Sequence, residues 1–91
     1  AIIVVDPSDI VVFLNKAAEI ICGKSRPRIP VALESFLRAS DVEFEDLLAA
    51  SRRGKAQGSV RIKSTGRILL ASRRMLPVAD RPRGFEIYFL R

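Results

Sequence analysis

The sequence predicts an α+β domain: one five-stranded antiparallel sheet with short helices on one face, in the order ββ-ααα-βββ. Three observations predict this class. Valine- and isoleucine-rich runs open the chain, the middle carries apolar residues at helical spacing, and the sequence from residue 57 onward alternates between apolar and polar. Strands on both sides of a helical middle are typical of α+β domains. The 91 residues suffice for one small core, and a hydrophobic content of 48% excludes a disordered segment.

The first two strands are expected at Ala1–Val5 and Ile10–Leu14, because both runs are rich in β-branched residues. Asp6-Pro7-Ser8-Asp9 between them suits a type I turn, which makes the pair a hairpin. Asn15 follows at a position where its side chain can cap a helix. A short helix is therefore expected over Lys16–Cys22.

Gly23 is a natural residue to follow the end of that helix. The next segment, Lys24–Pro30, contains two prolines and three cations, so an irregular loop is expected. A short turn of helix is expected after it, since Leu33, Phe36 and Leu37 have the spacing of one helical face.

Ser40-Asp41-Val42-Glu43 reads as a capping box, with serine at the cap and glutamate three residues later. Phe44, Leu47, Leu48 and Ser51 then follow at i, i+3, i+4 and i+7. These signals predict a helix that begins at Ser40 and stops at Gly54.

The C-terminal part predicts three strands. The first begins at Gln57 and alternates apolar and polar residues, so one of its faces is expected to meet water. Thr65-Gly66 forms a turn into a longer strand, Ile68–Leu76. A second turn at Arg81-Pro82-Arg83-Gly84 leads into the last strand, Phe85–Leu90.

The N-terminal segment IIVVDPSDIVVFLNKAAEIICG resembles the start of a PAS domain, where a hairpin leads into Asn-x-Ala-Ala-Glu and a glycine. The order of the later elements is similar to that family as well. The resemblance implies a five-stranded sheet with a pocket between sheet and helices. It also implies a sensory and dimerisation module of larger bacterial signalling proteins, such as histidine kinases and transcription regulators. We therefore expect residues 1–91 to be a single domain of such a protein, in the cytoplasm.

If the module senses a small molecule, an anionic or apolar ligand is expected in that pocket. Neighbouring strand residues point to opposite faces, so one of Arg73 and Arg74 must face the helices and could anchor an anion. The alternative is that both arginines reach the sheet edge or pair with Glu86. The residues expected to line the pocket are Phe13, Phe36, Leu48, Met75 and one of Arg73 and Arg74.

The strands also carry more apolar surface than a few short helices can cover. A homodimer partner or flanking helices are expected to cover the second face of the sheet. The interface residues expected there are Val4, Leu70, Leu76 and Tyr88. The alternative function is a ligand-free protein–protein interaction module that works by association alone.

No cofactor, metal site or catalytic residue is expected. The chain contains no histidine, which excludes haem ligation and acid–base catalysis by histidine. The family's flavin photosensors carry their cysteine in Asn-Cys-Arg-Phe, whereas Cys22 stands in Ile-Ile-Cys-Gly. Cys22 is interpreted as a buried small hydrophobe; a redox thiol activated by Lys24 and Arg26 is the alternative.

The net charge of +6 raises the question of nucleic acid. The cations, however, are scattered over loops and helix ends, and aromatic residues at exposed positions are not indicated, so nucleic-acid binding is disfavoured. No apolar run approaches the roughly 18 residues of a membrane span, and no membrane association is expected.

Overall fold

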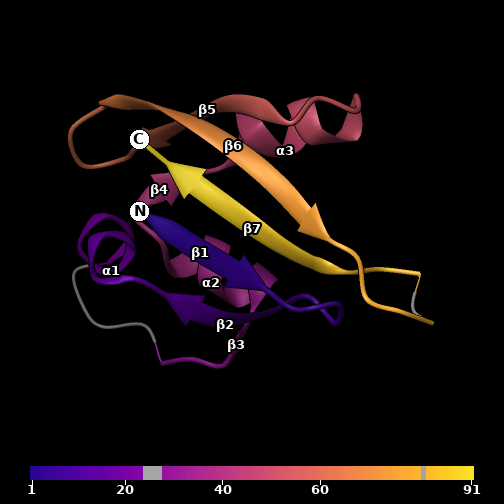
Figure 1. Cartoon of the computed structure of the whole chain (residues 1–91). Coiled ribbons are helices and arrows are strands. Elements are labelled where there is room, and N and C mark those ends of the chain that lie inside the picture. The colour runs from indigo at the N-terminus through magenta and orange to yellow at the C-terminus, as the bar shows by residue number, and fades with distance from the viewer. Residues whose placement is uncertain (24–27, 81) are drawn as a thin grey trace.

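One curled antiparallel sheet, shaped like half of a barrel, forms the body of the molecule in the computed structural model, which describes residues 1–23, 28–80 and 82–91 (Figure 1). Three short helices accompany the sheet. In chain order the elements are β1 (Ile2–Val5), β2 (Ile10–Leu14), α1 (Lys16–Cys22), β3 (Val31–Ala32), α2 (Leu33–Ala39), β4 (Val42–Glu43), α3 (Glu45–Arg52), β5 (Gln57–Ile62), β6 (Ile68–Leu76) and β7 (Phe85–Leu90).

The prediction of a five-stranded sheet in the order ββ-ααα-βββ is wrong. The sheet has seven strands in the spatial order β3-β2-β1-β7-β6-β5-β4. The two additional strands, β3 and β4, alternate with the helices along the chain and form the two edges of the sheet. Each is two residues long, which is too short for an alternating pattern to appear in the sequence.

The N-terminal hairpin and first helix lie where the sequence predicted them. The N–H of Asp9 donates to the carbonyl of Asp6 at 3.1 Å across the β1–β2 turn. Asn15 caps α1, because its Oδ1 accepts the N–H of Ala18 at 2.9 Å. The same oxygen accepts the N–H of Ile2 at 2.9 Å, so this side chain also fixes the helix against β1. Gly23 ends the helix with extended backbone.

The capping box expected at Ser40 does not form. The hydroxyl of Ser40 accepts the N–H of Val42, two residues later, at 3.1 Å, and this local bond takes the chain into β4. Glu43, expected to complete the box, instead accepts two bonds from Arg61 on the neighbouring strand. Helix α3 consequently begins at Glu45, without a side-chain cap.

Residues 31–43 cross the sheet from one edge to the other. They begin with β3 at the β2 edge, continue through α2 and end with β4 at the β5 edge. We call this segment the strap. On the underside of α2, Phe36 is buried in the core cluster with Ile3 of β1 and Tyr88 of β7, so the strap covers the inner face of the sheet.

The helices pack on that inner face at close range. On β5, a Cβ atom added to Gly58 would lie 3.1 Å from the Cα of Leu47, which explains why glycine stands where α3 crosses the strand. Parts of two predicted loops, residues 24–27 and residue 81, lie outside the described residues. The core consists of Ile3, Val5, Val11, Leu14, Ala18, Cys22, Phe36, Val42, Phe44, Leu47, Val60, Leu69, Ala71, Tyr88 and Leu90.

Candidate functional site

The space between helices and sheet, where the resemblance implied a pocket, is nearly filled. Ile3 and Tyr88 of the sheet and Phe36 and Leu48 of the helices enclose only about 10 Å³ there. Phe36 and Leu48 therefore lie where the sequence placed them, but they fill the interior instead of lining an open cavity.

Arg73 and Arg74 point to opposite sides of β6, as the alternation of a strand requires. Arg73 faces the helices, and its guanidinium lies 3.6 Å from Oε1 of Glu86 on β7, the partner that the alternative interpretation named. Arg74 lies opposite Ile87 on the other face and is exposed. Met75 lies opposite Glu86 near the end of β6, where it is half-exposed.

The expectation that Phe13 lines the pocket is wrong. The pairing register places Phe13 opposite Val4, which in turn lies opposite Ile87, so all three share the face away from the helices. Phe13 is 47% exposed there. A register shift between Val4 and Val5 sets this orientation, and such an irregularity is not visible in an apolar run.

The face of the sheet turned away from the helices is mainly apolar, and no helix among the described residues covers it. We call it the outer face. Of the predicted interface residues, Val4, Leu70 and Leu76 lie on it, with Leu70 72% exposed. The apolar residues of the outer face are Ile2, Val4, Phe13, Ile68, Leu70, Leu76, Phe85, Ile87 and Phe89.

The assignment of Tyr88 to that interface is wrong, because Tyr88 is on the inner face and only 4% exposed. Its ring meets that of Phe44 edge to face, with centroids 6.5 Å apart. Its hydroxyl donates to Oε2 of Glu86 at 2.5 Å. Burial, followed by this bond to Glu86, raises the pKa of Tyr88 well above its ordinary value.

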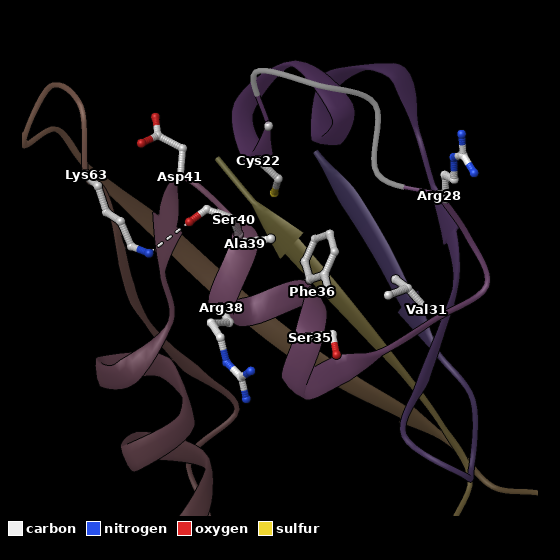
Figure 2. A pocket seen from close by; sticks show the side chains of 11 residues that line it. Cys22, Arg28, Val31, Ser35, Phe36, Arg38, Ala39, Ser40, Asp41 and Lys63 are labelled. Carbon is white, nitrogen blue, oxygen red and sulfur yellow. Dashed lines mark hydrogen bonds between the residues drawn. The ribbon is translucent and has the colours of Figure 1, made fainter.

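A larger hollow of about 540 Å³ opens beside the strap, between the end of α1, α2 and the turn after β5 (Figure 2). Phe36 and Val31 turn toward its interior (Figure 2). Gly23 and Arg28, which flank the undescribed segment, both line it. The complete lining is Cys22, Gly23, Arg28, Val31, Ser35, Phe36, Arg38, Ala39, Ser40, Asp41 and Lys63.

The charged groups of the hollow are mainly positive. Arg28, Arg38 and Lys63 stand against the single carboxylate of Asp41. Lys63 donates to the carbonyl of Ser40 at 2.9 Å, and Asp41 accepts the Ser64 hydroxyl at 2.6 Å. The sequence does not indicate this site, because Ser40-Asp41-Val42-Glu43 has the pattern of a helix cap.

Cys22 lies at the buried side of the hollow, next to Ser40. Burial raises the pKa of the Cys22 thiol, although the bond to Ser40 partly opposes this shift. A raised pKa keeps the thiol protonated, which fits a buried hydrophobe and not an activated redox thiol. The expected activators, Lys24 and Arg26, lie outside the described residues.

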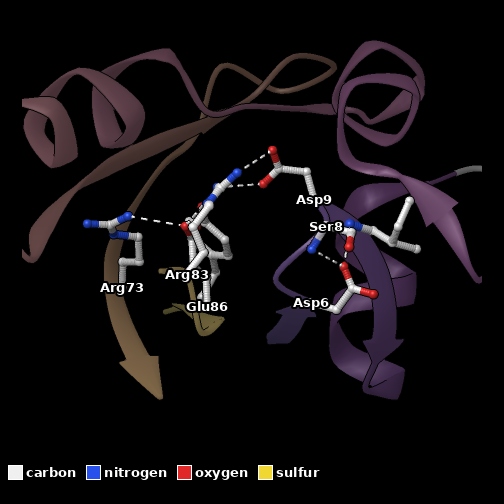
Figure 3. Close-up of polar contacts among 8 residues, drawn as sticks. Asp6, Ser8, Asp9, Arg73, Arg83 and Glu86 are labelled. Atoms are coloured by element: carbon white, nitrogen blue, oxygen red, sulfur yellow. Dashed lines mark hydrogen bonds and ion pairs between the residues drawn. The ribbon is translucent and has the colours of Figure 1, made fainter. Parts of the chain in front are cut away.

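A polar cluster joins the β1–β2 turn to the segment before β7 (Figure 3). Arg83 binds both carboxylate oxygens of Asp9, at 2.7 and 2.9 Å. The bonds to Asp9 raise the pKa of Arg83. Arg83 also lies 3.6 Å from Glu86, which Arg73 approaches at the same distance from the other side. Two cations and two carboxylates thus balance one another.

Two further features concern metals and membranes. The described residues hold no group of three or more acidic, cysteine or histidine side chains placed for a metal ion. Among residues 1–23, 28–80 and 82–91, no helix has the length and apolar composition to span a membrane.

Comparison with known proteins adds no assignment: no model of a protein family matches the chain, and no curated protein or solved structure is significantly similar to it.

Proposed function

We propose that this chain is a non-catalytic regulatory module of the PAS type that acts by association, with a second copy of itself bound to the outer face of the sheet. The exposure of this apolar face is the observation that carries the proposal. Leu70, Ile68 and Leu76 of β6 are all more than half exposed. Leu76 lies opposite Phe85 of β7, whereas Ile68 and Leu70 lie at the other end of β6, opposite Arg61 and Ser59 of β5. Contiguous apolar surface of this kind marks interaction sites in folded proteins.

A second copy suits this face for two reasons. Its centre is formed by Phe85, Ile87 and Phe89 of β7, and an apolar row of this kind is complementary to the same row of a second copy, with Arg74 as the charged neighbour of Ile87. Symmetric dimers also bury the same patch on both subunits, and they are the commonest oligomers of soluble proteins. Two sheets packed face to face would place these rows about 10 Å apart.

The nearly filled interior supports association over sensing inside the domain. With only about 10 Å³ between Tyr88 and the helices, a ligand would have to displace core side chains. The resemblance of residues 2–23 to PAS domains supports a place in a larger cytoplasmic signalling protein of bacteria, such as a histidine kinase or transcription regulator.

Sedimentation equilibrium over a concentration series tests this proposal. The wild-type chain of 10.1 kDa should approach twice its monomer mass as concentration rises. Leu70→Glu should remain monomeric, because burying a carboxylate within the apolar interface costs free energy.

The matched control is Ile20→Glu. Ile20 on α1 is 71% exposed, almost the same as Leu70, and the substitution adds the same charge away from the outer face. This variant should associate like the wild type. A wild-type chain that stays monomeric at the highest concentration contradicts the proposal, as does equal dissociation of both variants.

A second candidate function is recognition of a small anionic molecule in the hollow beside the strap. The specific observation that favours it is the combination of an apolar interior, at Phe36 and Val31, with the cations Arg28 and Lys63. Pockets that bind small molecules commonly combine an apolar lining with a few convergent polar groups.

Native mass spectrometry of the purified chain tests this second function. We expect a small-molecule adduct on the wild type and its loss in Ser35→Trp, whose indole would occupy part of the hollow. Ile20→Glu should retain the adduct. A wild-type spectrum that shows only the mass of the chain argues against sensing at this site.

A further inference from the structure

The strap, residues 31–43, is held firmly at its C-terminal end. The N–H of Asp41 donates to the carbonyl of Cys22 at 2.8 Å, and its own carbonyl accepts the N–H of Lys63 at 2.6 Å. The carboxylate of Asp41 also accepts the Ser64 hydroxyl at 2.6 Å. Glu43 adds bonds to Arg61 at 2.7 and 3.1 Å. Backbone and side chains therefore both anchor this end.

The N-terminal end of the strap depends on Asp9. The N–H of Leu33, the first residue of α2, donates to the carbonyl of Asp9 at 2.8 Å. The two pairs of β3 with β2 involve Ile10 and Val11, which directly follow Asp9. Asp9 itself has a φ of 60°, a left-handed conformation that residues other than glycine rarely adopt. The start of α2 is therefore bonded to this turn, in addition to the packing of Val31 and Leu33 against the core. Asp6 holds the other side of the turn, since its Oδ1 accepts the N–H groups of Ser8 and Ile10.

Arg83 holds the side chain of Asp9 from the far end of the sequence. Its two terminal nitrogens bind the two carboxylate oxygens at 2.7 and 2.9 Å, the bidentate geometry that gives arginine pairs their strength and direction (Figure 3). The same guanidinium lies 3.6 Å from Glu86, whose carboxylate is buried and also receives the Tyr88 hydroxyl. The segment before β7 is thus tied to the beginning of the strap.

We propose that the Asp9–Arg83 pair is a latch that holds the N-terminal end of the strap and thereby controls access to the hollow and to Cys22. When the latch is broken, the start of α2 separates locally from the sheet while the rest of the chain stays folded. Phe36 of the strap, which lines the hollow with Cys22, then moves with the released segment, whereas Ser40 stays with the anchored C-terminal end.

The latch is accessible to ions and small molecules in solution. The side chains of Arg83 and Asp9 are 51% and 47% exposed, so added salt or an anion that competes for Arg83 weakens their pair. The network behind it is less accessible, because the Glu86 side chain is only 10% exposed. The proposal does not depend on association and is tested at concentrations where the chain is monomeric.

Alkylation of Cys22 by iodoacetamide measures this opening, since Cys22 is the only cysteine in the sequence and is buried. Asp9→Asn removes the charge, and asparagine tolerates the left-handed backbone. Arg83→Gln removes the other half of the pair. Each should raise the alkylation rate roughly two- to fivefold, as expected for loss of an exposed bidentate pair. Hydrogen exchange at the Leu33 amide should accelerate by a similar factor.

Three comparisons make the test specific. The double variant should react no faster than either single variant, because each already removes the same interaction. Salt should accelerate alkylation of the wild type but not of Asp9→Asn. Glu34→Gln breaks an ion pair that lies wholly within α2, at 3.2 Å from Arg38, and should leave the rate unchanged.

Four outcomes would contradict the proposal that the Asp9–Arg83 pair is a latch. These are an unchanged rate in Asp9→Asn and Arg83→Gln, additive effects in the double variant, an equal effect of Glu34→Gln, and a rise fully accounted for by lower global stability in urea. The last outcome would mean that Cys22 reacts only from the unfolded chain.

Discussion

The thiol of Cys22 and the hydroxyl of Tyr88 are both buried, and burial penalises their ionised forms. Both pKa values are raised above the ordinary values of 9.0 for cysteine and 10.0 for tyrosine. The folded chain therefore keeps both protons at a pH where the unfolded chain has begun to release them. Stability linked to these protons is fully present below the unfolded pKa values and is lost as the pH rises above them.

We expect the free energy of unfolding to fall as the pH rises above about 9, and more steeply above about 10. Urea denaturation at a series of pH values measures this. In Cys22→Ala the decline should begin about one pH unit later, because only Tyr88 then contributes. A stability that is constant through this range, or an identical onset in the variant, would show that these protons do not stabilise the fold.

Single residues also show which predictions from local sequence patterns hold and which fail. The prediction of Asn15 as a cap is correct because its signal is local and its Oδ1 accepts the N–H of Ile2 without losing the bond from Ala18. Ser40 and Glu43 carry an equally good local signal for a helix cap, but their side chains bond elsewhere. Ser40 accepts the N–H of Val42, and Glu43 accepts a bond from Arg61 on the neighbouring strand. The sequence predicts that Arg73 and Arg74 point to opposite faces of the sheet. Which of the two faces the helices is decided by the pairing register with β7, which places Arg73 opposite Tyr88.

Strand β6 shows the difference between the two faces of the sheet within one element. Leu69 is 7% exposed and packs in the core, whereas Leu70 points out from the opposite face. Leu69→Ala should lower the free energy of unfolding by about 2–4 kcal/mol through lost burial and a new cavity.

Leu70→Ala should change the stability of the monomer by only about 0.5 kcal/mol or less, since its side chain is already in water. Urea denaturation at low protein concentration compares the two variants directly. Equal losses would mean that the outer face is covered within the chain itself.

The elements that the sequence predicted correctly are those with many residues of one pattern. β2, β5, β6 and β7 span five to nine residues each, so alternation or a β-branched run is visible in them. β3 and β4 have no such pattern and exist because their backbone groups complete the edges of a sheet already formed. Their absence from the prediction is what made the expected sheet two strands too small.

At the scale of the whole molecule, the strap decides where a small molecule could bind. The strap crosses from one sheet edge to the other and places Phe36 in the core, which fills the space above the central strands. The open hollow therefore lies next to the strap, between α1, α2 and the turn after β5. The predicted pocket residues Phe13, Leu48 and Met75 are therefore not brought together. The residues that do meet come from separate parts of the chain: Cys22 from α1, Asp41 from the segment before β4 and Lys63 from the turn after β5.

The sequence by itself determined the positions of the long strands, the first helix and its cap, and an excess of apolar strand surface, because periodicity and capping act between residues close in the chain. Only the tertiary structure decided the strand number, the site of the hollow, the burial of Tyr88 and the Asp9–Arg83 latch. These features depend on register and on contacts between residues far apart in the chain, such as Asp9 and Arg83, which are 74 positions apart, and local patterns do not record such contacts.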